Sequence, residues 1–218
     1  MIVYGSSLSP YVRKVLVVAA EKGIDIDLQP TGPRPGEPSA EYLEASPLRK
    51  MPALRDGDFT LADSSAIIHY LEAKFPERSI IPTEPKARGR TIWFEEYADT
   101  VMMACGGKIF FNRVVAPRFL KKPGDESVAA AAERDELPPI LDYLESVMPG
   151  EGGYLVGDQL TLADIAVASP FATLGHAGLE IARDKHPKLG AFLDRILGRP
   201  SFSRYLEQER ALMERVAA

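Results

Sequence analysis

The sequence predicts an α/β domain at the front of the chain and an all-α helical bundle behind it. Over roughly the first 75 residues, short apolar runs typical of strands alternate with helical patterns. A stretch with three prolines, residues 75–85, separates the two parts, and no strand alternation follows it. We therefore expect a domain of residues 1–76, a linker at 77–86 and a helical domain at 87–218.

The composition is that of a globular protein rather than a disordered or fibrous one. Of 218 residues, 45% are hydrophobic and 26% are charged, and the formal net charge is −5. A mildly acidic chain lacks the overall positive field on which non-specific nucleic-acid binding depends. We see no signal peptide, no apolar run of 18 residues and a single cysteine, Cys105. We expect a cytoplasmic protein that binds neither nucleic acid nor membrane.

The front of the chain opens with a strand, a helix and a second strand. Residues 1–4 form a short apolar run. A helix starts at Ser9 and Pro10, because serine is a strong N-cap and proline is favoured at the first helical position. Gly23 is placed to end that helix as a C-cap. Apolar and polar residues alternate over 24–29, and a helix between two strands predicts that they pair in parallel.

A loop, a short helix, a hairpin and a further helix complete the front domain. Residues 29–39 hold four prolines and form the loop, and residues 40–45 carry a short helical pattern. Two apolar runs within 53–61 flank Asp56-Gly57-Asp58, a turn signal that predicts an antiparallel hairpin. Residues 63–74 then show the apolar spacing of a helix.

The second domain is predicted to hold about five helices. One covers 86–115, with a candidate break at Gly106-Gly107. The next covers 126–148 and should kink or break at Pro138-Pro139, because an interior proline costs a helix about 3 kcal/mol. The remaining three are predicted at 161–175, 187–197 and 200–215. The front domain is small and should dock on this bundle, and a crevice between two domains is a usual place for a ligand.

Ser9 is the first candidate for chemistry, because it starts a helix directly after a strand. A helix N-terminus carries about half a positive charge and free N–H groups, so an anion or a thiolate placed there is stabilised. The Ser9 hydroxyl either caps the helix in the ordinary way or hydrogen-bonds such a group. Position alone leaves both interpretations open.

A second candidate is the segment Lys50-Met51-Pro52-Ala53, directly before the hairpin. A cis bond before Pro52 would leave the main-chain N–H and C=O of Met51 free to pair with a peptide-like ligand. The alternative is an ordinary trans proline that starts an edge strand, and trans is by far the commoner form.

Two helix starts provide the remaining local signals. Asp63-Ser64-Ser65-Ala66-Ile67 leads from a strand into a helix, where N–H groups can hold a carboxylate and Asp63 can pair with an ammonium group. The alternative there is simple capping. Thr161 and Asp164 match a capping box in front of an apolar run, which we interpret as structural.

Common metal, nucleotide and hydrolase motifs are absent from the sequence. The three histidines lack metal-ligand spacing, and there is no Cys-x-x-Cys pair, phosphate-binding glycine loop or nucleophile elbow. We expect no metal, and we interpret Cys105 as a small buried apolar residue. One group of aromatic residues and methionines can be core or can line an apolar cleft: Trp93, Phe94, Tyr97, Met102, Met103, Phe110 and Phe111.

Four segments together resemble the glutathione transferase family. Residues 9–15, Ser-Pro-Tyr-Val-Arg-Lys-Val, are similar to the first helix of its serine-type classes. Residues 46–54 resemble its N-P-x-x-K-[VI]-P-x-L segment, and residues 63–67 resemble its [ED]-S-x-A-I turn. Residues 155–164 resemble its G-x-x-[LF]-[ST]-x-A-D signature. The four occur in the family's order and span nearly the whole chain.

The resemblance implies a thioredoxin-like domain followed by an all-α domain, usually in a homodimer. It implies that Ser9 hydrogen-bonds the sulfur of glutathione and holds it as a thiolate, which attacks a small hydrophobic electrophile. Ser6 and Ser7 are alternatives to Ser9 for this role. We assign the apolar cleft for the electrophile to Tyr11, Met102, Met103, Phe110 and Phe111.

The resemblance also assigns the contacts to glutathione, the co-substrate. The main chain of Met51, with Pro52 cis, would pair with the cysteinyl part, and Lys50 would meet the glycine carboxylate. Asp63 and Ser64 would take the γ-glutamyl end. A lysine, an N–H-rich turn and an aspartate match the two carboxylates and one ammonium group of glutathione.

Some assignments stay open within the resemblance. Arg34 or Arg49 can supply a further basic contact to the glycine carboxylate, and Asp63 is shorter than the glutamate often found at its position. Serine stands where cysteine-type members have cysteine, which argues against a dithiol mechanism. The alternatives to a transferase are a glutathione-dependent isomerase, dehalogenase or ether-cleaving enzyme, or a transferase-like binding module without catalysis.

Overall fold

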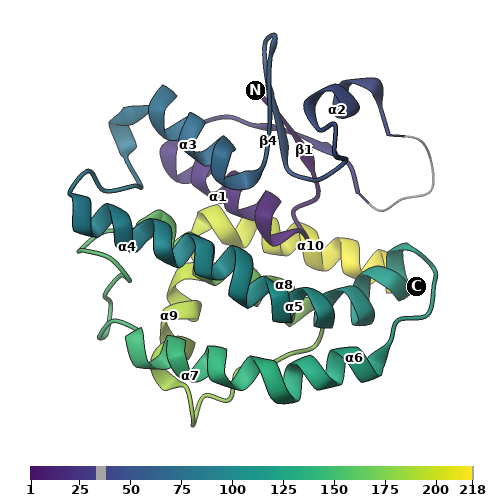
Figure 1. The fold of residues 1–218 in the computed structure, drawn as a ribbon, viewed down its shortest axis with the longest axis vertical. Coiled ribbons are helices and arrows are strands. Elements are labelled where there is room, and N and C mark those ends of the chain that lie inside the picture. Colours follow the sequence, from purple (N-terminus) through teal and green to yellow (C-terminus); the bar gives the residue numbers. More distant parts are fainter. Residues whose placement is uncertain (33–37, 218) are drawn as a thin grey trace. The chain divides into compact units, whose positions relative to one another are not determined.

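The computed structural model describes residues 1–32 and 38–217, so Arg34 lies outside the described residues. The chain divides into two compact units, Met1–Ile80 and Ile81–Ala218 (Figure 1). The first is a mixed sheet with helices and the second is helical, which confirms the fold class expected from the sequence. Within the described part of the chain, no helix is both long and apolar enough to cross a membrane.

The first unit is built on a four-stranded sheet in the order β2-β1-β3-β4. The parallel pairing of β1 with β2 and the antiparallel β3–β4 hairpin are as predicted, and β1 also pairs antiparallel with β3. β2 starts later than its alternation suggests, because the N–H of Ile24 bonds to the carbonyl of Ala19 and finishes the helix end at Gly23. The strands are β1 (Ile2–Gly5), β2 (Asp27–Pro30), β3 (Ala53–Asp56) and β4 (Phe59–Ala62).

Helices cover both faces of this sheet (Figure 1). Tyr4 and Ala53 pack with Tyr42 and Ala45 of the short helix α2 in one buried cluster. Because side chains alternate along a strand, the neighbouring Val3 and its partner Leu54, both fully buried, face the opposite side with α1 and α3. The helices are α1 (Pro10–Lys22), α2 (Ala40–Ala45), α3 (Ser64–Lys74) and the short 3₁₀ turn η1 (Pro76–Arg78).

The second unit begins with one long helical rod, and the candidate break at Gly106-Gly107 is not present. α5 runs through both glycines, and a Cβ at Gly106 would lie 3.5 Å from Leu174 of α8, an ordinary contact distance. The irregularities are π-helical stretches on either side of α5. The rod consists of α4 (Pro85–Glu96), η2 (Tyr97–Met102), α5 (Met103–Phe110) and η3 (Phe111–Phe119).

A second helical rod, residues 126–147, contains two prolines just after a π-helical stretch. Pro138 and Pro139 lie in the first turn of α7, and the N–H of Leu137 just before them bonds to the carbonyl of Ala132, five residues back. The helix changes from π to α form here, at the place where the sequence predicts a kink or a break, and neither proline has an N–H to donate. The rod consists of α6 (Glu126–Ala131), η4 (Ala132–Glu136) and α7 (Leu137–Val147).

α8 is the core of the second unit. Every residue from Leu162 to Leu174 is buried, and the helix packs against α4, α5, α9 and α10. Its start is the predicted capping box, in which Asp164 accepts from the N–H of Thr161 at 2.8 Å. Burial raises the pKa of Asp164, and hydrogen bonds from Leu155 and Thr161 oppose that rise. The last helices are α8 (Leu162–His176), α9 (Pro187–Leu197) and α10 (Pro200–Ala217).

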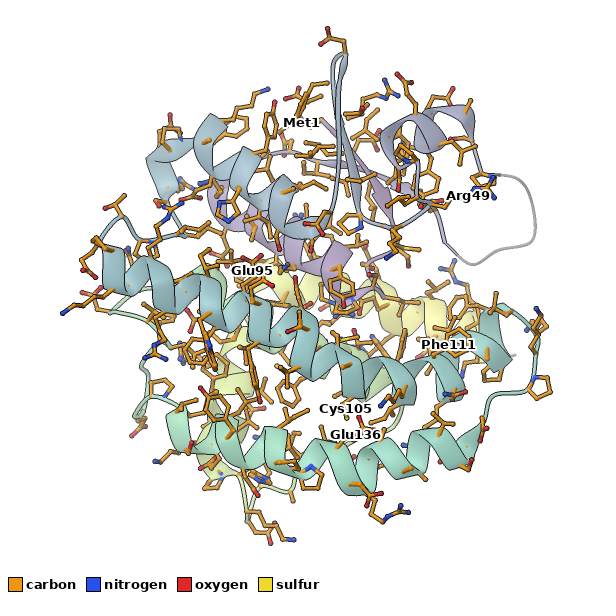
Figure 2. The ribbon with its side chains drawn as sticks, viewed as in Figure 1. Met1, Arg49, Glu95, Cys105, Phe111 and Glu136 are labelled. Atoms are coloured by element: carbon orange, nitrogen blue, oxygen red, sulfur yellow. The ribbon has the colours of Figure 1, made fainter. Side chains whose placement is uncertain are left out.

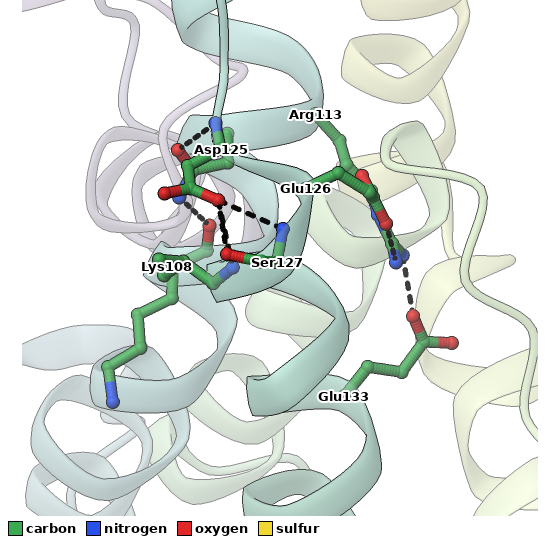
Figure 3. Close-up of polar contacts among 8 residues, drawn as sticks. Lys108, Arg113, Asp125, Glu126, Ser127 and Glu133 are labelled. Carbon is green, nitrogen blue, oxygen red and sulfur yellow. Dashed lines mark hydrogen bonds and ion pairs between the residues drawn. The ribbon is translucent and has the colours of Figure 1, made fainter.

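Arg113 ties the two rods together at their connection (Figure 3). Its guanidinium forms ion pairs with Glu126 at 2.7 Å and with Glu133 at 2.6 Å. Asp125 caps α6 by accepting from the N–H of Ser127. The two ion pairs of Arg113 join η3 to α6 and to η4.

Candidate functional site

Ser9 lies at the N-cap of α1 with a hydroxyl that does not cap the helix. Its main-chain N–H donates to the carbonyl of Ser6 at 2.9 Å, and its carbonyl accepts from the N–H of Arg13 at 2.9 Å. Pro10 occupies the first helical position, as predicted, and the Ser9 side chain makes no capping hydrogen bond. Ser9 as a residue is partly exposed, and it stands at the positive end of α1.

The neighbouring serines and Tyr11 lie close to Ser9 in the chain. Ser7 is only 8% exposed, whereas Ser6 is partly exposed. Neither is the N-cap residue of α1. Tyr11 is in the first turn of α1 and is partly exposed.

The Met51–Pro52 peptide bond is cis, the form that the sequence left as the rarer alternative. Lys50 is exposed, and Pro52 is buried directly before β3 begins at Ala53. Among the described residues, none forms a hydrogen bond to the main chain of Met51. Its N–H and C=O therefore lie at the sheet end without a partner in the described structure.

Asp63 links β4 to α3 in an unusual backbone conformation. Its φ is 84°, in the left-handed region that favours glycine, and its Oδ1 accepts from the N–H groups of Ser65 and Ala66 at 3.0 Å each. Non-glycine residues with positive φ store strain that is common at functional sites. Asp63 is exposed, whereas Ser64 is 3% exposed.

The strand register brings three loops to the same end of the sheet. Tyr4 at the end of β1 pairs with Ala53 at the start of β3, and Ala53 pairs with Ala62 at the end of β4. The chain therefore leaves β1 toward Ser9, enters β3 from Met51 and leaves β4 at Asp63, all at this one end. Residues from three distant parts of the sequence share this edge of the first unit.

The predicted electrophile residues of the second unit differ in exposure. Met102 and Phe110 are 4% and 9% exposed, whereas Met103 is partly exposed and Phe111 is 49% exposed (Figure 2). The methyl group of Met103 lies 3.9 Å from the place where a Cβ of Gly107 would be. The second unit also holds a shallow pocket of about 400 Å³, and none of these four residues lines it.

Cys105 and Glu136 lie on facing sides of that pocket, and both are labelled in Figure 2. Cys105 is 1% exposed and donates from Sγ to the carbonyl of Ala132 at 3.5 Å. Burial raises the pKa of its thiol to about 11, and the nearby Glu136 carboxylate adds to this. The interpretation of Cys105 as a small buried residue is confirmed.

Sequence reasoning missed the role of Ser46 in holding this edge. The Ser46 side chain is fully buried and makes two hydrogen bonds to the main chain of Lys50. Arg49 is exposed, with φ 56°. Serine followed by proline is a common pair, so the sequence gives no signal for a hydrogen bond from Ser46 to the main chain of Lys50.

Family models match both parts of the chain. The glutathione S-transferase N-terminal domain matches residues 3–79, and the glutathione S-transferase C-terminal domain matches residues 111–209. Glutathione S-transferase 3 from Zea mays is 30% identical over 92% of this chain and 90% of its own length. The chain belongs to the glutathione S-transferase family. The thioredoxin-like first domain and helical second domain of that family are the two units described above.

Other members of the glutathione S-transferase family and its relatives match over similar lengths. A glutathione S-transferase from Hyoscyamus muticus is 28% identical over 95% of this chain and 98% of that protein. A stringent starvation protein A homolog from Coxiella burnetii is 26% identical over 99% of this chain and 96% of that protein. A glutathione S-transferase structure from Rhodospirillum rubrum F11 superposes with a TM-score of 0.82, at 25% identity, over 94% of this chain and 90% of that chain.

Across residues 1–32 and 38–217 of this glutathione S-transferase family member, no group of three or more histidine, cysteine, aspartate or glutamate side chains is placed to hold a metal ion. The candidate groups of the first unit are a hydroxyl, a helix N-terminus, a lysine and an aspartate at one sheet end.

Proposed function

We propose that this glutathione S-transferase family member joins the sulfur of glutathione to small hydrophobic electrophiles. One observation carries the proposal: the register Tyr4–Ala53–Ala62 gathers Ser9, Met51 and Asp63 at one end of the sheet. A hydroxyl at a helix N-terminus, a main-chain edge and a carboxylate are the groups that a thiol tripeptide requires. The family supports glutathione as the co-substrate.

Ser9 is proposed to hold the glutathione sulfur as a thiolate. A free thiol has a pKa of about 8.5 and is only slightly ionised at pH 7. Lowering that pKa by two units requires about 2.7 kcal/mol of preferential thiolate binding. A hydrogen bond donated by the Ser9 hydroxyl, together with the positive end of α1, is of this magnitude.

The conjugation step needs no further catalytic group from the protein. The thiol proton leaves to solvent, and the thiolate attacks an electron-poor carbon. A C–S bond forms while the bond to the leaving group breaks, and the leaving group departs with its electron pair. The protein contributes a larger ionised fraction of the thiol and the alignment of the two reactants.

The remaining first-unit residues are proposed to bind glutathione. The main chain of Met51, next to Pro52, pairs with the cysteinyl part in the manner of an added strand. Lys50 meets the glycine carboxylate, and the exposed Asp63 meets the α-ammonium of the γ-glutamyl end. The first N–H groups of α3, which begins at Ser64, lie toward the γ-glutamyl carboxylate.

The electrophile is proposed to bind among apolar side chains contributed largely by the helical domain. The exposed Phe111 and the partly exposed Met103 are accessible in the second unit. Met102 and Phe110, which are buried, belong to the same predicted set. Tyr11, in the first turn of α1, stays a prediction from the family resemblance.

The test is the Ser9→Ala variant, with Ser6→Ala as its matched control. We expect Ser9→Ala to bind glutathione by calorimetry but to lose at least about tenfold in kcat/KM with an aryl halide at pH 7. Its activity should rise with pH toward the pKa of free thiol. Ser6→Ala should behave as wild type. Unchanged turnover in Ser9→Ala would remove Ser9 from the mechanism.

A second candidate function is a transferase-like binding module without catalysis. It is favoured by one observation, the match over nearly its whole length to a relative named as a stringent starvation protein rather than as a transferase. Absence of glutathione binding by calorimetry at millimolar concentration, with no turnover of a substrate panel, would favour this function over conjugation.

The same proposal includes the oligomeric state of the protein and its location in the cell. We expect a homodimer that detoxifies electrophiles in the cytoplasm, where a chain with a single cysteine tolerates reducing conditions. Sedimentation should give about twice the 23.9 kDa mass of one chain. A sedimenting mass equal to one chain would contradict the dimer.

A further inference from the structure

The hydroxyl of Ser46 closes a five-residue loop on itself. Ser46 Oγ donates to the carbonyl of Lys50 at 2.6 Å and accepts from the N–H of Lys50 at 3.0 Å. The carbonyl of Ser46 also accepts from the N–H of Arg49 at 2.9 Å. One buried side chain therefore holds both main-chain polar groups of the residue that precedes Met51.

Ser46 is itself held rigidly. It follows α2 directly, its N–H donates to the carbonyl of Tyr42 at 2.7 Å, and its residue surface is fully buried. Tyr42 is buried in one cluster with Tyr4 and Ala53, so the main chain of Ser46 is hydrogen-bonded to a packed residue.

The rest of the loop has no packing of its own. Pro47, Leu48, Arg49 and Lys50 are all exposed, and Leu48 is 80% exposed (Figure 2 labels Arg49). Arg49 has a φ of 56°, a conformation that non-glycine residues adopt uncommonly. The direction in which the loop presents Lys50 therefore depends on the Ser46 hydrogen bonds rather than on apolar contacts.

We infer that Ser46 is a positioning residue for the thiol-tripeptide ligand, acting through Lys50 and the main chain of Met51. The inference rests on the proposed function. Ser46 sets the Lys50 ammonium for a ligand carboxylate and the Met51 main chain for strand-like pairing. Ser9 is on a different segment, after β1, so the state of the thiol does not depend on Ser46.

Because Ser46 acts on Lys50 and Met51 while Ser9 acts on the thiol, loss of the Ser46 hydroxyl should affect binding and not the chemical step. Loss of the Ser46 hydroxyl frees Lys50 and Met51 and weakens ground-state binding of glutathione. Binding that is equal in ground and transition states changes KM and leaves kcat unaltered. The pH dependence of kcat at saturating glutathione should also stay as in wild type, because it reports the thiol beside Ser9.

The experiment compares three variants of the full chain. Ser46→Ala removes the hydroxyl, and Ser46→Asn restores one donor and one acceptor. Ser39→Ala is the matched control, because Ser39 caps the other end of α2 by accepting from Tyr42 N–H at 3.2 Å and does not contact Lys50. Calorimetry measures the Kd for glutathione, steady-state kinetics measures KM and kcat, and NMR measures exchange of the Lys50 amide proton.

We expect Ser46→Ala to raise the Kd and KM for glutathione about tenfold, with kcat within about twofold of wild type. Ser46→Asn should recover most of the loss, and Ser39→Ala should keep the wild-type Kd. Without ligand, the Lys50 amide should exchange faster in Ser46→Ala than in wild type.

Two outcomes would overturn the role of Ser46 while leaving the proposed function intact. One is an unchanged Kd in Ser46→Ala, and the other is an equal rise in Kd in Ser39→Ala, which would mean that general loosening of α2 is responsible. If the wild-type chain itself fails to bind glutathione, the proposed function fails and the positioning role falls with it. The Lys50 exchange rate still reports the hydrogen bond in that case, so the two failures are distinguishable.

Discussion

The carboxylate of Asp63 accepts a 3.0 Å hydrogen bond from the main-chain N–H of Ala66, so the proposed ligand of an ammonium group also caps α3. The same Oδ1 accepts from the N–H of Ser65, and Oδ2 accepts no hydrogen bond from any described residue. One oxygen thus stabilises the helix while the other is available to a ligand. The cap and the charge can be separated by substitution.

Asp63→Asn should keep the cap and lose the charge, because its amide oxygen can still accept from Ser65 and Ala66. We expect stability close to wild type, since asparagine also tolerates positive φ. The KM for glutathione should rise about tenfold, because a charge-assisted contact to the ammonium is lost. Asp63→Ala should show the same KM effect and also lose about 1 kcal/mol of stability. An unchanged KM in Asp63→Asn would remove Asp63 from ammonium binding.

Cys105 should resist alkylation in the folded protein. Burial raises its thiol pKa to about 11, so almost no thiolate exists at pH 8. We expect iodoacetamide to react at least about a hundredfold more slowly with the native chain than with the chain in denaturant, where the pKa is about 8.5. Because the raised pKa belongs to the folded state, its stabilising contribution is complete below about pH 8.5 and is lost as the pH rises through about 11. Equal rates in the two states would contradict the burial.

The ion pair between Arg113 and Glu126 should make stability depend on acid pH. The Arg113 guanidinium holds the pKa of Glu126 below its ordinary value. A lowered carboxyl pKa contributes stability above the unfolded value of about 4.3 and loses it as the pH falls through the folded value. Arg113→Gln should therefore be less stable than wild type at pH 7, with the difference shrinking below about pH 4 and in high salt. A difference that is independent of pH in urea unfolding would contradict this.

Two glycine substitutions should have opposite effects on stability. A Cβ on Gly124 would overlap the main-chain oxygen of Asn112 where the two rods connect, so Gly124→Ala should cost at least about 2 kcal/mol. Gly89 lies inside α4 with nothing within 4 Å of a Cβ, so Gly89→Ala should stabilise by about 0.5–1 kcal/mol. Urea unfolding of both variants checks the pair, and equal destabilisation would be the contrary result.

The local elements of this protein could be predicted from its sequence because their signals are local. Pro10 starts α1 and Gly23 ends it at φ 73°, and the turn at Gly57 joins the hairpin strands, as expected. The capping box of Thr161 and Asp164 was equally readable, since both of its partners are three residues apart. The glutathione transferase resemblance, carried by four short segments, is confirmed by the family models.

Other features depended on contacts between residues far apart in the chain, which residue patterns do not encode. Gly106 and Gly107 are a candidate helix break in the sequence, yet α5 continues through both and packs against α8. The sequence by itself determined which segments are helices and strands and supplied Ser9, Lys50 and Asp63 as candidates. Only the tertiary structure decided that their loops leave the sheet at one end, because strand register is set by hydrogen bonds between β1, β3 and β4.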